Sequence, residues 1–121
     1  MSLLEAQNAF VGDIARLIIF VQSSGWALSA GECWRPPEMQ EIYLNQGKSR
    51  TLKSKHAERL AMDFNFFDMS SGKAVLTFEK NKLQFIGDYW ESLDVKNKWG
   101  GNFKDKNGNS FLDTPHFERI V

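Results

Sequence analysis

The stretch SKHAERLAMDFNFF, residues 54–67, decides the fold of this chain. Its second half alternates between large apolar residues and small or polar ones, and the large ones are Leu60, Met62, Phe64 and Phe66. Alternate side chains of an extended strand point to opposite faces. We therefore predict a strand over residues 60–67, with one face in the core and the other small and polar around Asp63.

A helix is the competing interpretation of this stretch. A separation of seven residues also places His56 and Asp63 on one helical face, and AERLAM consists of good helix formers. The phenylalanine-rich continuation favours the strand. On a strand the odd separation would direct the two side chains to opposite faces, so His56 must approach Asp63 from the loop before the strand.

The rest of the chain mixes helical and extended patterns without regular alternation. Apolar residues at helical spacing predict helices over residues 5–23 and 82–93, the second with Leu83, Ile86 and Trp90 on one face. A third helix is expected after Pro36 and Pro37, ending near Gly47. Extended segments are expected over residues 25–37 and 115–121, with an uncertain hairpin over 71–82. This order predicts an α+β fold with a small, largely antiparallel sheet flanked by helices.

Length and composition restrict the function further. The chain has 121 residues, which predicts a single domain over residues 1–121. Its 15 basic and 15 acidic residues argue against a nucleic-acid binder driven by bulk charge. The N-terminus lacks the features of a signal peptide, and the apolar run LIIFVQ is too short to insert into a bilayer. We expect a monomer that binds no nucleic acid and does not insert into a membrane.

Both histidines of the chain lie near a carboxylate. His56 is followed by Asp63, and His116 follows Asp113 by three residues. Zinc is commonly held by His nitrogens and Asp or Glu oxygens, and a catalytic zinc site uses three protein ligands and leaves one position for water. His56, Asp63 and His116 would complete such a set, with Asp113 as general base. Hydrogen-bonded histidines and a turn at Asp113 are the alternatives that spacing alone leaves open.

Several ordered blocks resemble one family of zinc peptidases. The pattern S-x-H, six residues, then D covers Ser54 to Asp63; WGG follows at residues 99–101, and D-x-x-H-F at residues 113–117. The segment CWRPPEMQEIYLNQGKS also looks like the family's upstream region. Together these blocks resemble the D-alanyl-D-alanine carboxypeptidases and L-alanyl-D-glutamate endopeptidases that cut peptidoglycan, phage endolysins included. The resemblance covers roughly residues 25–118 and implies the fold shared by these peptidases and hedgehog signalling domains.

The resemblance also implies roles for individual residues. It assigns zinc to His56, Asp63 and His116, and catalysis to Asp113. Arg35 would contact either the transition-state oxyanion or a substrate carboxylate. Ser54 and Arg59 would contribute to substrate binding, and Arg59 departs from the family, which usually has glycine there.

The function implied is a zinc-dependent peptidase acting on peptidoglycan stem peptides. Zinc would activate water and polarise the scissile carbonyl, and Asp113 would accept the water proton and pass it to the leaving amine. The alternative is a noncatalytic, zinc-stabilised binding module on the same scaffold. Which stem-peptide bond is cut stays open, as does the choice between an endolysin and a recycling enzyme. We expect synthesis in a bacterial or phage-infected cytoplasm and action on the cell wall after release.

A few other residues carry weaker expectations. The single Cys33 excludes an internal disulfide framework and is expected to be a small buried group. Trp90 is expected in the core, and Glu91 is a reserve candidate for the catalytic carboxylate. The basic residues before His56 would form a solvated loop or a rim that attracts acidic peptides; they are Lys48, Arg50, Lys53 and Lys55.

Overall fold

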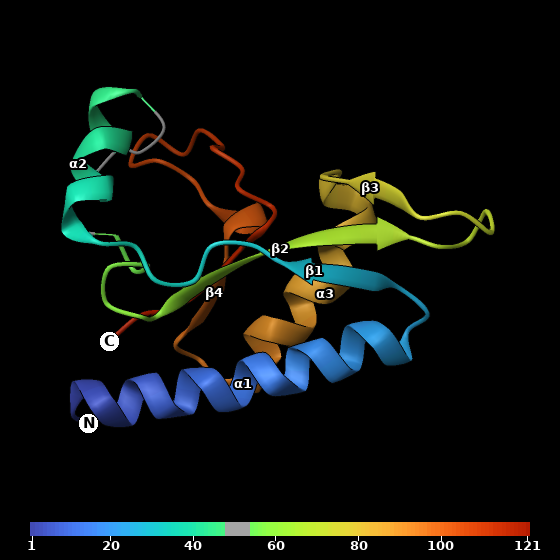
Figure 1. Ribbon diagram of the computed structural model, residues 1–121, viewed down its shortest axis with the longest axis horizontal. Helices are drawn as coiled ribbons and strands as arrows, with labels where there is room; N and C mark the ends of the chain where they lie inside the picture. Colours follow the sequence, from blue (N-terminus) through green and yellow to red (C-terminus); the bar gives the residue numbers. More distant parts are fainter. Residues whose placement is uncertain (48–53) are drawn as a thin grey trace.

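The protein is described here by a computed structural model that covers residues 1–47 and 54–121 (Figure 1). The helices are α1 (Leu3–Ser23), α2 (Pro37–Asn45) and α3 (Lys80–Leu93), with a 3-10 helix, η1, at Gly100–Asn102. The strands are β1 (Ala27–Ala30), β2 (Ala61–Asp68), β3 (Val75–Thr77), β4 (Asn97–Trp99) and β5 (His116–Arg119). The predicted α+β class is confirmed.

The sheet is built around β2. The strand order is β1-β2-β5-β4, β3 also pairs with β2, and every pairing is antiparallel. The first three residues of β2 pair with β5, while its later residues lie between β1 and β3. The stretch predicted as a strand therefore contacts three others. Of the hairpin expected over residues 71–82, only β3 is a strand; it pairs back with β2, and residues 80–82 begin α3.

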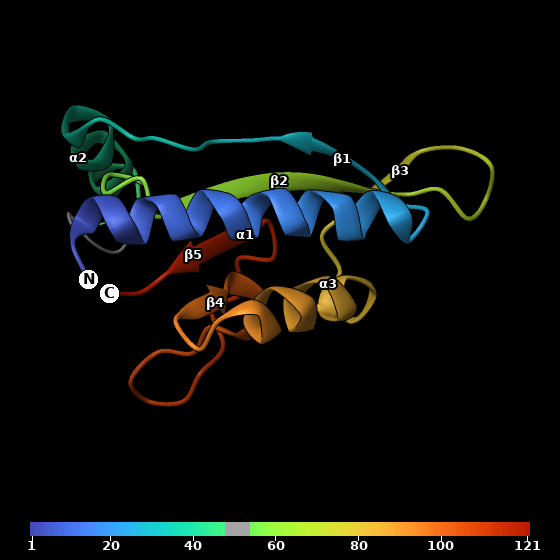
Figure 2. The same cartoon turned by 90° about the horizontal axis from the view of Figure 1, so that it is seen from below.

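The core lies between the sheet and two helices. Figure 2 shows α1 running along the sheet, with β1 and β2 on one side of it and β5, β4 and α3 on the other. Leu60, Phe64 and Phe66 are buried as predicted and pack with Phe117 and Trp90. The α3 face that carries Leu83 and Ile86 is also buried, as its spacing predicts. Burial of several such side chains, at roughly 1.5–3 kcal/mol each, stabilises the arrangement of sheet and helices.

Two helices differ in detail from the prediction. Helix α1 begins at Leu3, two residues earlier than predicted, because the Ser2 hydroxyl accepts from the Glu5 N–H and the Glu5 carboxylate accepts from the Ser2 N–H. Helix α2 does not place its apolar residues in the core: Ile42 is 43% exposed, and Gln40 is the buried residue of this helix. The polar side chain of Gln40 belongs to the site described below.

The sheet face away from α1 is polar at its centre. Because side chains alternate, Asp63 and His116 point away from the core residues Phe64 and Phe117. Figure 1 shows α2 and the segment between η1 and β5 on this side of the sheet, opposite α1. The fold thus surrounds the carboxylate of β2 with segments that are distant in sequence.

Candidate metal centre

Asp63 and His116 are direct partners across the β2–β5 pair. Such partners project to the same face with their Cβ atoms a few ångströms apart, and here Asp63 Oδ1 lies 3.1 Å from His116 Nδ1. The backbone of Asp63 is fixed on its other side, where its N–H donates to Glu32 O and its carbonyl accepts from Gly31 N–H, both at 2.8 Å. The sheet therefore sets the positions of both side chains.

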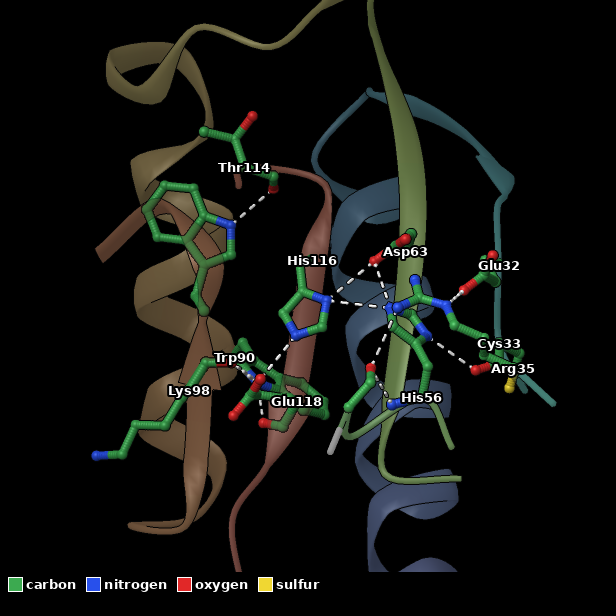
Figure 3. Close-up of polar contacts among 12 residues, drawn as sticks. Glu32, Cys33, Arg35, His56, Asp63, Trp90, Lys98, Thr114, His116 and Glu118 are labelled. Atoms are coloured by element: carbon green, nitrogen blue, oxygen red, sulfur yellow. Dashed lines mark hydrogen bonds and ion pairs between the residues drawn. The ribbon is translucent and has the colours of Figure 1, made fainter. Parts of the chain in front are cut away.

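His56 comes from the turn that precedes β2, as the strand interpretation requires. The Leu60 N–H donates to Lys55 O at 2.9 Å and closes the turn, while the Ser54 hydroxyl accepts from the His56 N–H at 3.1 Å. His56 is buried, and its Nε2 lies 3.2 Å from both Asp63 Oδ1 and His116 Nδ1. Figure 3 shows the three side chains pointing toward one another.

The three facing atoms fit the edges of a metal coordination sphere. A tetrahedral ion with ligands about 2.0–2.1 Å away has ligand-to-ligand edges of roughly 3.3 Å. The observed triangle has sides of 3.1, 3.2 and 3.2 Å. Among the residues that the structure describes, this trio is the group of histidine, cysteine and acidic side chains whose atoms converge closely enough to hold an ion.

The outer ring nitrogens of both histidines are already engaged. His56 Nδ1 lies 2.9 Å from the carbonyl oxygen of Cys33, and His116 Nε2 lies 2.7 Å from Glu118 Oε1. Both oxygens can only accept, so a neutral ring that keeps its proton on the outer nitrogen presents the lone pair of its inner nitrogen. Two lone pairs and a carboxylate oxygen that converge in this way suit a cation.

The pKa values of Asp63 and His116 describe the protein without an ion. Burial lowers the pKa of His116, but its hydrogen bonds with Asp63 and Glu118 outweigh this effect and raise it to about 9. Burial raises the pKa of Asp63, but its hydrogen bonds with His116 and His56 outweigh this and lower it to about 2. In the absence of a metal ion, a protonated His116 between two carboxylates thus provides the positive charge that the trio accommodates.

Asp113 lies at the entry to β5, beside the trio. Its N–H donates to Gly100 O, and its carbonyl accepts from the His116 N–H, both at 3.0 Å. The residue is exposed, and no described residue hydrogen-bonds its carboxylate. Partial burial of the carboxyl group raises the pKa of Asp113, the charge of His116 opposes this effect, and the charge of Asp63 adds to it. A carboxylate with a raised pKa is better suited to accept and return a proton near neutral pH.

The WGG block, residues 99–101, explains why the segment that carries Asp113 can lie so close to the backbone of η1. A Cβ atom on Gly100 would fall 2.1 Å from the carbonyl oxygen of Asp113 and 3.0 Å from the Cβ of His116. The Trp99 indole N–H donates to Thr114 O at 2.9 Å. The glycine therefore permits a close approach of two backbones, and the tryptophan holds the turn between Asp113 and His116.

Arg35 is held by several side chains at the edge of the site. Its Nε is paired with Glu32, and its Nη1 donates to Gln40 Oε1 at 2.6 Å and to Ser54 Oγ at 3.3 Å. The guanidinium also lies 4.8 Å from the centre of the Tyr43 ring. The positive charge of Arg35 opposes the rise in the pKa of Asp113 that burial causes. Ser54 thus joins two predicted site residues, since it contacts both Arg35 and the backbone of His56.

Arg59 occupies a position that favours glycine. Its φ of 59° makes it the one non-glycine residue with positive φ among the described residues. Glycine would adopt this conformation without the steric penalty of a Cβ atom. The Arg59 side chain lies over the Trp34 ring, with Cζ 4.5 Å from the ring centre, and no described contact joins it to the trio.

Three polar residues of the site were not foreseen from the sequence. Glu118 follows His116 by two residues, so strand alternation alone would have placed both on one face. Glu32 and Gln40, which hold Arg35, gave no sequence signal, because a polar residue in an extended segment or a helix is usually solvated.

Other expectations are corrected or limited. Cys33 is exposed, not buried, and its backbone carbonyl, not its thiol, contacts His56. Glu91 does not belong to the converging trio; it accepts from the Trp99 N–H at 2.9 Å and the Asn102 side chain at 3.2 Å. Most of the basic rim lies outside the described residues, and Lys55 pairs with Glu58 at 3.4 Å. No helix within the described ranges is long and apolar enough to span a membrane.

Comparison with known proteins adds to this geometry. A family profile described as D-alanyl-D-alanine carboxypeptidase matches residues 47–119, more than half of the chain. The crystal structure of the L-Ala D-Glu endopeptidase ChiX of Serratia marcescens is similar, with a TM-score of 0.58 and 24% sequence identity. That similarity covers 77% of this chain and 66% of the solved one, so the chain spans just under two thirds of its length. No curated protein matches the chain.

Proposed function

Because the chain belongs to the D-alanyl-D-alanine carboxypeptidase family, we propose that it is a zinc metallopeptidase that hydrolyses a peptide bond in peptidoglycan stem peptides. The observation that carries the proposal is the triangle of His56 Nε2, Asp63 Oδ1 and His116 Nδ1, with sides of 3.1 to 3.2 Å. Two histidines and one carboxylate form a donor set suited to zinc, and they leave a fourth position open.

The zinc ion would supply an activated water and a Lewis acid for the scissile carbonyl. His56, Asp63 and His116 would hold it. Their backbones are fixed by the sheet and by the closed turn before β2, so little reorganisation would accompany binding.

Asp113 is the proposed general acid and base. Its carboxylate has no hydrogen-bond partner among the described residues, and burial raises its pKa. It would accept a proton from the attacking water and return it to the leaving amine of the product. The backbone bonds to Gly100 and His116 would keep this carboxylate beside the trio during both transfers.

Arg35 is the proposed cationic contact of the substrate. Glu32, Gln40 and Ser54 bind two of its nitrogens, and no acceptor among the described residues binds Nη2. That nitrogen would donate either to the oxyanion of the transition state or to a substrate carboxylate. Ser54 would act mainly by orienting Arg35, and Arg59 would line the substrate path beside Trp34.

Two bonds are candidates for cleavage. The family description names removal of a terminal D-alanine, and the similar Serratia structure is of an L-Ala D-Glu endopeptidase. Both reactions require the same groups and differ in how the substrate enters the cleft. We propose action on the cell wall, as an endolysin or a recycling enzyme made in a bacterial or phage-infected cell and working as a monomer.

Mass spectrometry of purified peptidoglycan fragments tests this proposal. The zinc-loaded protein should release either a terminal D-alanine or fragments split between L-alanine and D-glutamate, and a chelator should abolish the reaction. Intact fragments after incubation with folded, zinc-loaded protein would overturn it and favour the noncatalytic binding module on the same scaffold.

A further inference from the structure

Glu118 contacts the trio from outside through His116. It lies two residues after His116 on β5, so both side chains leave the same face of the strand. Its Oε1 lies 2.7 Å from His116 Nε2, the shortest contact of either histidine ring. Figure 3 shows this carboxylate on the side of the His116 ring that faces away from Asp63.

The strand partners of Glu118 hold it in this position. β5 is an inner strand, and Glu118 is in register with Ala61 on β2 and with Lys98 on β4. The backbone carbonyl of Glu118 accepts from the Trp90 indole at 3.2 Å. Within the described ranges the carboxylate is paired with His116 and not with the neighbouring Lys98.

A His116 ring that binds a metal ion is neutral and keeps one proton, and a carboxylate faces each of its two nitrogens. Asp63 faces Nδ1, and Glu118 faces Nε2. A neutral imidazole has one ring proton. If it sits on Nδ1, it blocks the atom that faces the ion site; if it sits on Nε2, Nδ1 offers its lone pair.

We propose that Glu118 is a positioning residue that keeps the ring proton of His116 on Nε2 and thereby presents Nδ1 to the metal ion. This inference rests on the proposed function, because it assigns a role in the same metal centre. The equivalent acceptor for His56 is the backbone carbonyl of Cys33, which a substitution cannot remove. Glu118 is thus the acceptor that a substitution can remove. Its negative charge also makes Nδ1 of His116 a stronger electron-pair donor to the metal ion.

Zinc affinity, measured by competition with a chromogenic chelator, tests the inference in four proteins: the native chain, Glu118→Ala, Glu118→Gln and Asp88→Asn. Glu118→Ala should bind zinc about 10- to 100-fold more weakly, the range found when such partners are removed. Glu118→Gln keeps an acceptor but loses the charge, so its loss should be smaller. Asp88→Asn removes one charge from an exposed residue of α3 whose partner is Gln84, and it should bind like the native chain.

A spectroscopic readout separates positioning from general destabilisation. In the zinc-loaded native protein, nitrogen-15 NMR should show an Nε2–H on His116 that exchanges slowly with solvent. That proton should exchange faster in Glu118→Gln and become unprotected in Glu118→Ala, while the His56 ring signals stay unchanged.

The outcomes separate the proposed function from the proposed role of Glu118. Native protein that binds no zinc would overturn the proposed function together with this inference. Native protein that binds zinc, with both Glu118 variants of equal affinity and unchanged His116 signals, would overturn the role of Glu118 alone. If Glu118→Ala does not fold, the isosteric Glu118→Gln decides: a weaker zinc complex supports the inference, and native affinity overturns it.

Discussion

At the scale of single residues, the strongest local conflict between sequence and backbone is at Arg59. A side chain in the left-handed region costs roughly 1 kcal/mol or more relative to glycine, and Arg59 has φ of 59°. Its contact with Trp34, at 4.5 Å from the ring centre, offsets part of that cost.

This conflict predicts an order of stability. Arg59→Gly removes the strain, whereas Arg59→Ala keeps it and loses the contact with Trp34. We expect Arg59→Gly to have a free energy of unfolding about 1 kcal/mol higher than that of Arg59→Ala, measured by urea denaturation. Equal stability of the two variants, or a more stable alanine variant, would contradict the backbone conformation.

The sequence predicted the positions of those site residues that follow from the geometry of a single strand. Alternation along residues 60–67 placed Asp63 opposite the core face, and the odd separation placed His56 in the preceding turn. Glu32 and Gln40 could not be found, because their contacts with Arg35 depend on how α2 and the segment after β1 pack together. The exposure of Cys33 was missed for the same reason.

At the scale of elements, the pair of strands β2 and β5 is linked by the charges of Asp63 and His116. The pKa of Asp63 falls from 3.8 to about 2, so its stabilising effect is complete above pH 3.8 and is lost as the pH falls through about 2. The pKa of His116 rises from 6.5 to about 9, so its effect is complete below pH 6.5 and is lost as the pH rises through about 9.

The metal-free protein should therefore be most stable between about pH 4 and 6.5, as far as this pair is concerned. Thermal unfolding from pH 2 to 10 in the presence of chelator checks the range. Comparison with Asp63→Asn isolates the pair, because this variant should lose less stability than the native chain between pH 7 and 10. Parallel pH profiles of the two proteins would contradict the assignment.

The close approach of η1 to the entry of β5 gives a second element-scale prediction. Gly100→Ala would force a Cβ to within 2.1 Å of the Asp113 carbonyl, so one backbone must move. We expect a loss of roughly 2 kcal/mol or more in unfolding free energy. Gly12→Ala is the matched control, since its Cβ would meet only the flexible end of Arg16, at 3.2 Å, and alanine favours the helix. Equal effects of the two substitutions would contradict the close approach.

The elements themselves were predictable to different degrees. Helices α1 and α3 and strand β2 have long, periodic patterns, and each was predicted close to its observed bounds. Strand β4 was not predicted, because its three residues stand next to glycines and carry no pattern of their own. Pairing with β5 makes it a strand.

At the scale of the whole molecule, the central claim is that the metal centre and Asp113 together make a peptidase. The fold brings the three proposed ligands from a turn and two strands, and the proposed base from the entry to β5. If the protein were only a zinc-stabilised module, Asp113 would be dispensable, since it is not one of the three facing groups.

The rate of stem-peptide cleavage by native protein and by Asp113→Ala, at equal zinc occupancy, tests this claim most directly. The account predicts that zinc affinity stays near native while the cleavage rate falls by about 10²- to 10⁴-fold, the range for loss of a general acid–base group. Native cleavage rates in folded, zinc-loaded Asp113→Ala would contradict it.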